Sequence, residues 1–191
     1  MSQEMTIKKH SMFTTKEIVF TAFMAVIIAV CSWISIPAQV PFTLQTFAVF
    51  CALGLLGGKN GFFAVLVYIL LGICGVPVFA GFTGGIGIIM GSTGGYIVGF
   101  LLLAVVYLLA EKIPVKSGIA RFIVNVSAMI IGLGVCYAFG TAWFMYVYAK
   151  SAEIDLATAL KWCVTPFIPI DLAKMALAIV ITERVKKYVN I

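Results

Sequence analysis

Long apolar runs, separated by short clusters of charge or of proline and glycine, make up most of the chain. A helix needs about 20 apolar residues to cross the ~30 Å hydrocarbon core of a bilayer. Six runs approach or exceed this length, at residues 18–36, 43–57, 61–79, 88–110, 122–147 and 166–183, and the second is the shortest. The pattern predicts an all-α integral membrane protein, a single bundle of six transmembrane helices in one domain over residues 1–191.

The composition supports a membrane protein. Of the 191 residues, 63% are hydrophobic and 10% are charged, whereas a soluble domain has about 25% charged residues. The five cysteines have no paired spacing, and the only histidine, His10, lies in the polar N-terminal tail. We therefore expect no metal site, no cofactor and no enzymatic activity.

The net charge of +6 reflects short basic clusters between apolar runs, so we interpret it as a topology signal and expect no nucleic-acid partner. If the termini and alternate loops lie on one side, ten basic residues fall there and two, Lys150 and Lys161, fall on the other. The ten are Lys8, Lys9, Lys16, Lys59, Lys112, Lys116, Arg121, Arg184, Lys186 and Lys187. Basic residues favour the cytoplasmic side, which predicts that both termini are cytoplasmic.

The outer connections are then residues 37–42, 75–92 and 148–165. The first two contain no charged residue and are rich in proline or glycine. Loops exposed to water would be more polar, so we expect these two segments to fold back over the outer face of the bundle.

Half of the 18 glycines lie between Gly75 and Gly99. One interpretation is a packing stripe, because Gly87, Gly91, Gly95 and Gly99 recur every four residues and would share one helix face. The other is irregular backbone over residues 81–91, followed by a helix capped by Ser92 or Thr93 whose first amide groups bind a polar ligand. Both can hold if the stripe begins near Gly95.

Polar and small side chains mark two further segments. Thr43, Gln45 and Thr46 stand where the second run begins, and Thr43 is placed to cap that helix. In the first run, Ala25 and Ala29 lie one turn apart and allow another helix to approach closely, either within the chain or in a partner.

Asp171 and Lys174 interrupt the last apolar run. Three residues apart on a helix, they can contact each other, so they could form a self-neutralising pair that only lowers the cost of insertion. Apolar residues would often be as stable as such a pair, and ionisable groups inside a membrane usually mark a binding site. Asp171 lies about 8 Å along the helix from Pro166, which predicts a site that opens outward.

Three segments together resemble the BioY family, the biotin-binding substrate subunits of energy-coupling-factor (ECF) vitamin transporters. They are "VPFTLQTFAVF" at 40–50, "GVPVFAGFTGGIGIIMGSTGGYIVGF" at 75–100 and "PFIPIDLAKMALA" at 166–178. The family glycine motif commonly reads GPTGGY, whereas Ser92 stands here in place of the proline.

The resemblance implies a multi-pass protein of a bacterial-type cell membrane that captures biotin from the outside. It also implies an energising module of two ATPases and a coupling membrane protein, which would contact the first helix at Ala25 and Ala29.

On this interpretation Asp171 accepts hydrogen bonds from the biotin ureido group, and Lys174 donates to the ureido carbonyl or the carboxylate. The other expected contacts are Thr43, Gln45 and the backbone of Thr93, Gly94, Gly95 and Tyr96, with Phe79 and Tyr96 covering the rings. We also expect residues 37–43 to close over bound ligand.

An alternative function is a stand-alone secondary transporter of a small carboxylate, coupled to protons or ions, because buried carboxylates also relay protons. Such transporters usually contain repeated halves with interrupted helices in matching positions. Here only one half carries an ionisable pair, which favours the binding subunit.

Overall fold

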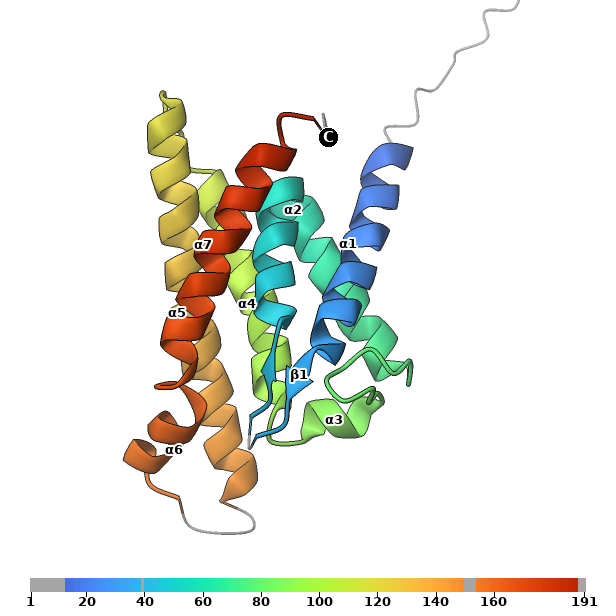
Figure 1. Cartoon of the computed structure of the whole chain (residues 1–191), viewed down its shortest axis with the longest axis vertical. Coiled ribbons are helices and arrows are strands. Elements are labelled where there is room, and N and C mark those ends of the chain that lie inside the picture. Colours follow the sequence, from blue (N-terminus) through green and yellow to red (C-terminus); the bar gives the residue numbers. More distant parts are fainter. Residues whose placement is uncertain (1–12, 39, 150–153, 189–191) are drawn as a thin grey trace, which may run out of the picture.

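The computed structural model describes residues 13–38, 40–149 and 154–188. Its elements are α1 (Thr15–Trp33), β1 (Ser35–Ile36), β2 (Phe42–Thr43), α2 (Gln45–Ile73), α3 (Ile86–Met90), α4 (Gly94–Glu111), α5 (Gly118–Tyr148), α6 (Leu156–Cys163) and α7 (Phe167–Val185). The long helices run side by side along the longest axis of the molecule (Figure 1). Five helical stretches are long and apolar enough to cross a membrane.

Helix α2 contains two of the six expected helices. Gly57 has a φ of 76°, a left-handed conformation that favours glycine, and it separates residues 45–56 from residues 58–73. In Figure 1 the two halves of α2 meet at the upper end of the molecule and diverge downward. The six-helix architecture is confirmed, although the second half of α2 ends at Ile73 rather than at residue 79.

The glycine-rich segment does not form the continuous helix expected over residues 88–110. Residues 86–90 form the short helix α3, Gly91 is extended, and α4 begins only at Gly94. The indole Nε1 of Trp143 donates to the Gly91 carbonyl oxygen at 3.0 Å, which helps to hold the break open. The prediction that Gly87, Gly91, Gly95 and Gly99 share one face of a single helix is therefore wrong.

The lower part of that stripe does pack helices together. A Cβ at Gly95 would lie 2.3 Å from Cβ of Trp143, and a Cβ at Gly99 would lie 2.7 Å from Sγ of Cys136. Both neighbours belong to α5, so these two glycines allow α4 and α5 to approach closely.

The outer connections contain more regular structure than expected. Residues 35–43 carry a two-stranded antiparallel hairpin that pairs Ser35 with Thr43 and Ile36 with Phe42. The connection at 148–165 contains α6, whose eight residues are too few to be recognised from periodicity.

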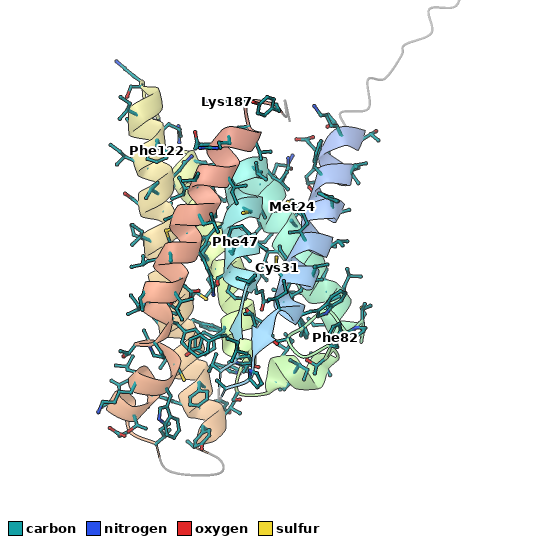
Figure 2. All side chains as sticks on the ribbon, viewed as in Figure 1. Met24, Cys31, Phe47, Phe82, Phe122 and Lys187 are labelled. Carbon is teal, nitrogen blue, oxygen red and sulfur yellow. The ribbon has the colours of Figure 1, made fainter. Side chains whose placement is uncertain are left out.

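The start of α1 and the end of α7 lie at the same end of the molecule, as an even number of spans requires (Figure 1). We call this the inner end and the opposite one the outer end, following the predicted charge asymmetry. Figure 2 shows Lys187 and Phe122 towards the inner end and Phe82 towards the outer end. Lys8, Lys9, His10 and Lys150 lie outside the described residues.

Candidate functional site

A cavity of about 270 Å³ lies between the outer parts of the helices. Its walls come from the hairpin, α2, the segment around α3, α4, α5 and the α6–α7 region. The lining residues are Val40, Pro41, Thr43, Gln45, Thr46, Phe79, Ala80, Thr83, Ile88, Thr93, Tyr96, Ile97, Phe100, Cys136, Tyr137, Cys163, Phe167, Asp171 and Lys174. Most are apolar or aromatic, and the two charged residues come from α7.

The polar end of the cavity is the ion pair of Asp171 and Lys174. Lys174 Nζ lies 2.8 Å from Asp171 Oδ1, and the two side chains are 11% and 2% exposed, respectively. Both residues fall in the first half of α7, close to its outer start, as their position in the sequence predicted.

Neighbouring elements complete the hydrogen bonds of this pair. Thr46 of α2 donates from Oγ1 to Asp171 Oδ1 at 2.8 Å, and Tyr137 of α5 donates to Asp171 Oδ2 at 2.7 Å. Lys174 Nζ also donates to Thr46 Oγ1 at 3.2 Å and to the Thr43 carbonyl oxygen at 2.7 Å. All three N–H donors of the ammonium group therefore have an acceptor, which is how a buried charge is tolerated.

The hairpin covers one side of the cavity. Val40 and Pro41 line the interior, and Phe42 stacks on Phe167 of α7 with ring centroids 4.1 Å apart and an interplanar angle of 7°. Together with the bond from Lys174 to the Thr43 carbonyl, this stacking joins the hairpin to α7. A two-stranded hairpin is at most marginally stable by itself, so these contacts hold it in place.

The segment between α2 and α3 forms another wall and is attached to the end of α1. Ser32 Oγ donates to the Val78 carbonyl oxygen, and Trp33 Nε1 donates to the Pro77 carbonyl oxygen at 2.9 Å. The adjacent Phe79 is 1% exposed and meets Tyr68 edge to face, with centroids 5.6 Å apart. This outer segment therefore folds back over the bundle, as its lack of charge suggested.

Seven of the nine residues expected to bind a ligand line this cavity, namely Thr43, Gln45, Phe79, Thr93, Tyr96, Asp171 and Lys174. Gly94 and Gly95 are not among the lining residues, because Gly94 packs on the Ile89 backbone and Gly95 on Trp143. Their expected contact with ligand stays a prediction.

Hydrogen bonds orient several of the predicted residues. Gln45 Nε2 donates to the Tyr68 hydroxyl at 2.8 Å, and the hydroxyls of Tyr96 and Thr141 lie 2.9 Å apart. Thr43 accepts from the Gln45 amide at 3.2 Å, so it does help to cap α2, although Leu44 is the N-cap residue. The Thr93 side chain makes no capping hydrogen bond.

Tyr137 and Thr46 complete the carboxylate site but were not predicted as site residues. Tyr137 lies in the middle of a long apolar run, and nothing local in the sequence distinguishes it from a packing tyrosine. Thr46 lies in the first turn of α2, and its hydroxyl reaches Asp171. Its position beside Thr43 and Gln45 in a polar cluster was the signal in the sequence that could have identified it.

Ala25 and Ala29 lie inside the bundle. They are 2% and 6% exposed and belong to one hydrophobic cluster with Ala48 and Val49 of α2. Their small size allows α1 and α2 to pack closely within this chain. Their expected role in partner binding stays a prediction.

A bundle of membrane-length helices around a mainly apolar cavity with a buried, fully hydrogen-bonded ion pair defines a membrane protein that binds a small solute with both apolar and polar parts. The BioY family model matches residues 2–191, and the chain belongs to the BioY family.

Similar proteins have been named for biotin transport. "Biotin transporter BioY" of Thermotoga maritima is 41% identical over 174 residues, which cover 90% of this chain and 96% of that protein. "Biotin transporter BioY2" of Lactococcus lactis is 38% identical over 158 residues, 82% of each chain. The crystal structure of the S-component for biotin from an ECF-type ABC transporter matches with a TM-score of 0.76 and 27% identity, covering 92% of this chain and 95% of that one.

Proposed function

We propose that this chain captures biotin at the outer face of the membrane as the substrate-binding component, or S-component, of an ECF-type transporter. The observation that carries the proposal is the buried Asp171–Lys174 pair at the polar end of the outer cavity, in a chain of the BioY family.

The chemistry of biotin matches that of the cavity. Its ureido group has two N–H donors and one carbonyl acceptor, its fused rings are apolar, and its tail ends in a carboxylate. Asp171 accepts three hydrogen bonds, and a carboxylate has about four acceptor sites, so one site is available without any rearrangement. A ureido N–H fits that site.

Lys174 can reach the ligand only by exchanging a partner. Its three donors go to Asp171, Thr46 and the Thr43 carbonyl. The bond to Asp171 joins opposite charges and is the strongest of the three, so a neutral acceptor is replaced first. We infer that a carbonyl or carboxylate oxygen of biotin takes the place of Thr43 or Thr46.

The proposed transport cycle needs a partner. In it an energising module of two ATPases and a coupling membrane protein supplies the energy, and this chain supplies recognition. Membership of the BioY family and the likeness to an S-component support this division of labour.

The test is a binding measurement on purified protein in detergent or nanodiscs with labelled biotin. We expect saturable binding that excess unlabelled biotin displaces and that other vitamins, such as thiamine and riboflavin, do not. Equal displacement by all three vitamins, or no binding at all, would contradict the proposal.

A further inference from the structure

A second cavity, of about 340 Å³, lies at the inner end and has no role in the proposed capture of biotin. Its polar lining comes from four elements: Glu17 in the first turn of α1, Asn60 in α2, Tyr107 and Glu111 in α4, and Lys186 directly after α7. Residues far apart in the sequence therefore converge where the charge pattern places the cytoplasm.

The two carboxylates in this cavity have unused acceptor capacity. Glu17 Oε2 accepts from the Thr14 amide at 2.7 Å and from the Thr14 hydroxyl at 3.0 Å, and its Oε1 accepts from Asn60 Nδ2 at a long 3.3 Å. Glu111 Oε2 accepts from the Gly58 amide at 2.6 Å, whereas no hydrogen bond reaches Glu111 Oε1 within the described part of the chain.

Asn60 provides independent evidence for a ligand in this cavity. It is 6% exposed, and within the described part of the chain its Oδ1 has no hydrogen-bond partner. Leaving a buried amide oxygen without a donor costs about 1–3 kcal/mol, so such an atom calls for an explanation. A ligand that donates hydrogen bonds would satisfy Asn60 and both carboxylates together.

The charge of this cavity contrasts with its surroundings. Basic residues predominate at the inner end, including Lys112, Lys116, Arg121, Arg184 and Lys187. Among the described residues, Lys186 is the only basic residue that lines the cavity, and it lies 3.4 Å from Glu183, a carboxylate that does not line it. Lys59 does not line the cavity but is near enough to attract the carboxylate of Glu17. The described lining thus carries two carboxylates against one ammonium group, which leaves it complementary to a further cation.

We propose that this inner cavity receives a guanidinium or ammonium side chain of a membrane protein that docks at the inner end. The inference rests on the proposed function, in which a coupling membrane protein associates with this chain. The cavity has room for a whole side chain, and the described residues contain no group of three His, Cys, Asp or Glu that could hold a metal ion.

The experiment compares the affinity of the energising module for the wild-type chain and for E17Q/E111Q in nanodiscs. Glutamine keeps one oxygen that can accept the hydrogen bonds from Thr14 and Gly58, removes the charge and replaces the second acceptor oxygen with an NH2 group. E183Q is the matched control, because it removes an inner-end carboxylate that does not line the cavity, and the ion pair with Lys186 that it breaks is exposed and weak. Biotin binding is measured on each variant as the test of folding.

We expect E17Q/E111Q to bind the module about tenfold or more weakly, E183Q to bind within about twofold of wild type, and all three to bind biotin equally. Salt should weaken the wild-type association more than that of E17Q/E111Q. The proposal would be overturned if E17Q/E111Q binds biotin normally and binds the module with the same affinity and the same salt dependence as the wild-type chain.

A further measurement tests an inorganic ion as the occupant. If sodium, potassium or magnesium chloride at low millimolar concentration raises the melting temperature of the isolated wild-type chain but not that of E17Q/E111Q, the cavity is an ion site and the docking proposal is wrong. A wild-type chain that fails to bind biotin would instead overturn the proposed function, so the two failures are distinguishable.

Discussion

Asp171 and Lys174 are held by contacts from three other elements, the hairpin, α2 and α5. Replacing one partner of a buried ion pair leaves an uncompensated charge and costs about 3–5 kcal/mol. The two residues therefore contribute to the stability of the bundle as well as to recognition, and a test of recognition must separate these contributions.

We expect D171N and K174M each to weaken biotin binding by about 100-fold or more, because truncating one member of a buried charge pair costs about 2–5 kcal/mol in binding. Each variant should also unfold at a lower temperature. The double variant D171N/K174M removes both charges, so its melting temperature should recover while its affinity does not. Equilibrium binding and thermal unfolding measure the two effects.

The control for this prediction is a second pair on the same helix. Glu183 and Lys186 have the same spacing and lie 3.4 Å apart, but their side chains are 54% and 40% exposed. E183Q should leave biotin affinity within about twofold of wild type, because exposed ion pairs contribute about 0–1 kcal/mol. Near-native affinity in both D171N and K174M would contradict the assignment of the pair.

At the scale of elements, the hairpin and the segment between α2 and α3 both contribute to the wall of the outer cavity, through Val40 and Ala80. Neither belongs to a transmembrane helix. They are therefore the parts of the wall that can move with the least disruption of helix packing.

Linking these two segments should slow biotin exchange. The variant is V40C/A80C in a background where the exposed Cys74 is serine, and its two cysteines are joined with a short bifunctional maleimide. We expect the linked protein to release bound biotin at least about tenfold more slowly. Each single-cysteine protein, treated in the same way, is the control. If the linked protein releases biotin at the control rate, the hairpin is not a lid.

The contact between α4 and α5 gives a second prediction about elements. G95A places a methyl group 2.3 Å from Cβ of Trp143, and such overpacking should destabilise the bundle by about 1–3 kcal/mol. G134A is the matched control on α5, because a Cβ there meets nothing within 4 Å. Thermal unfolding should show a lower melting temperature for G95A alone. Equal melting temperatures would mean that the interface relaxes around the methyl group.

The sequence allowed the long helices to be predicted better than the short elements. Hydropathy follows the length of a bilayer span, so the ends of α5 and α7 fall within a few residues of the predicted runs. The break at Gly91 was not predicted, because it depends on a hydrogen bond from Trp143, 52 residues further along the chain. The hairpin likewise depends on its contacts with α7.

The candidate site shows the same division between local and distant signals. Asp171 and Lys174 were identified because charge is rare in an apolar run. Tyr137 was missed because its role depends on which face of α5 meets α7, and this is a property of packing rather than of local sequence.

For the whole molecule, the charge distribution predicts which end faces the cytoplasm. In intact cells, a membrane-impermeant maleimide should label Cys74, which is exposed and directly follows α2 at the outer end. A K116C variant in a C74S background should be labelled only after the membrane is permeabilised, because residue 116 lies between α4 and α5 at the inner end. Labelling of K116C but not of Cys74 in intact cells would reverse the orientation.

The occupied donors of Lys174 also bear on how this protein chooses among solutes. All three donors of Lys174 already have acceptors, so a solute gains little merely by being negatively charged or by filling space. A molecule that displaces Thr43 or Thr46 without offering an acceptor in the same place leaves the buried cation short of a hydrogen bond, at a cost of about 1–3 kcal/mol or more. Discrimination against solutes of similar size that place no carbonyl or carboxylate oxygen at this position would then come from this rejection rather than from extra attraction to biotin.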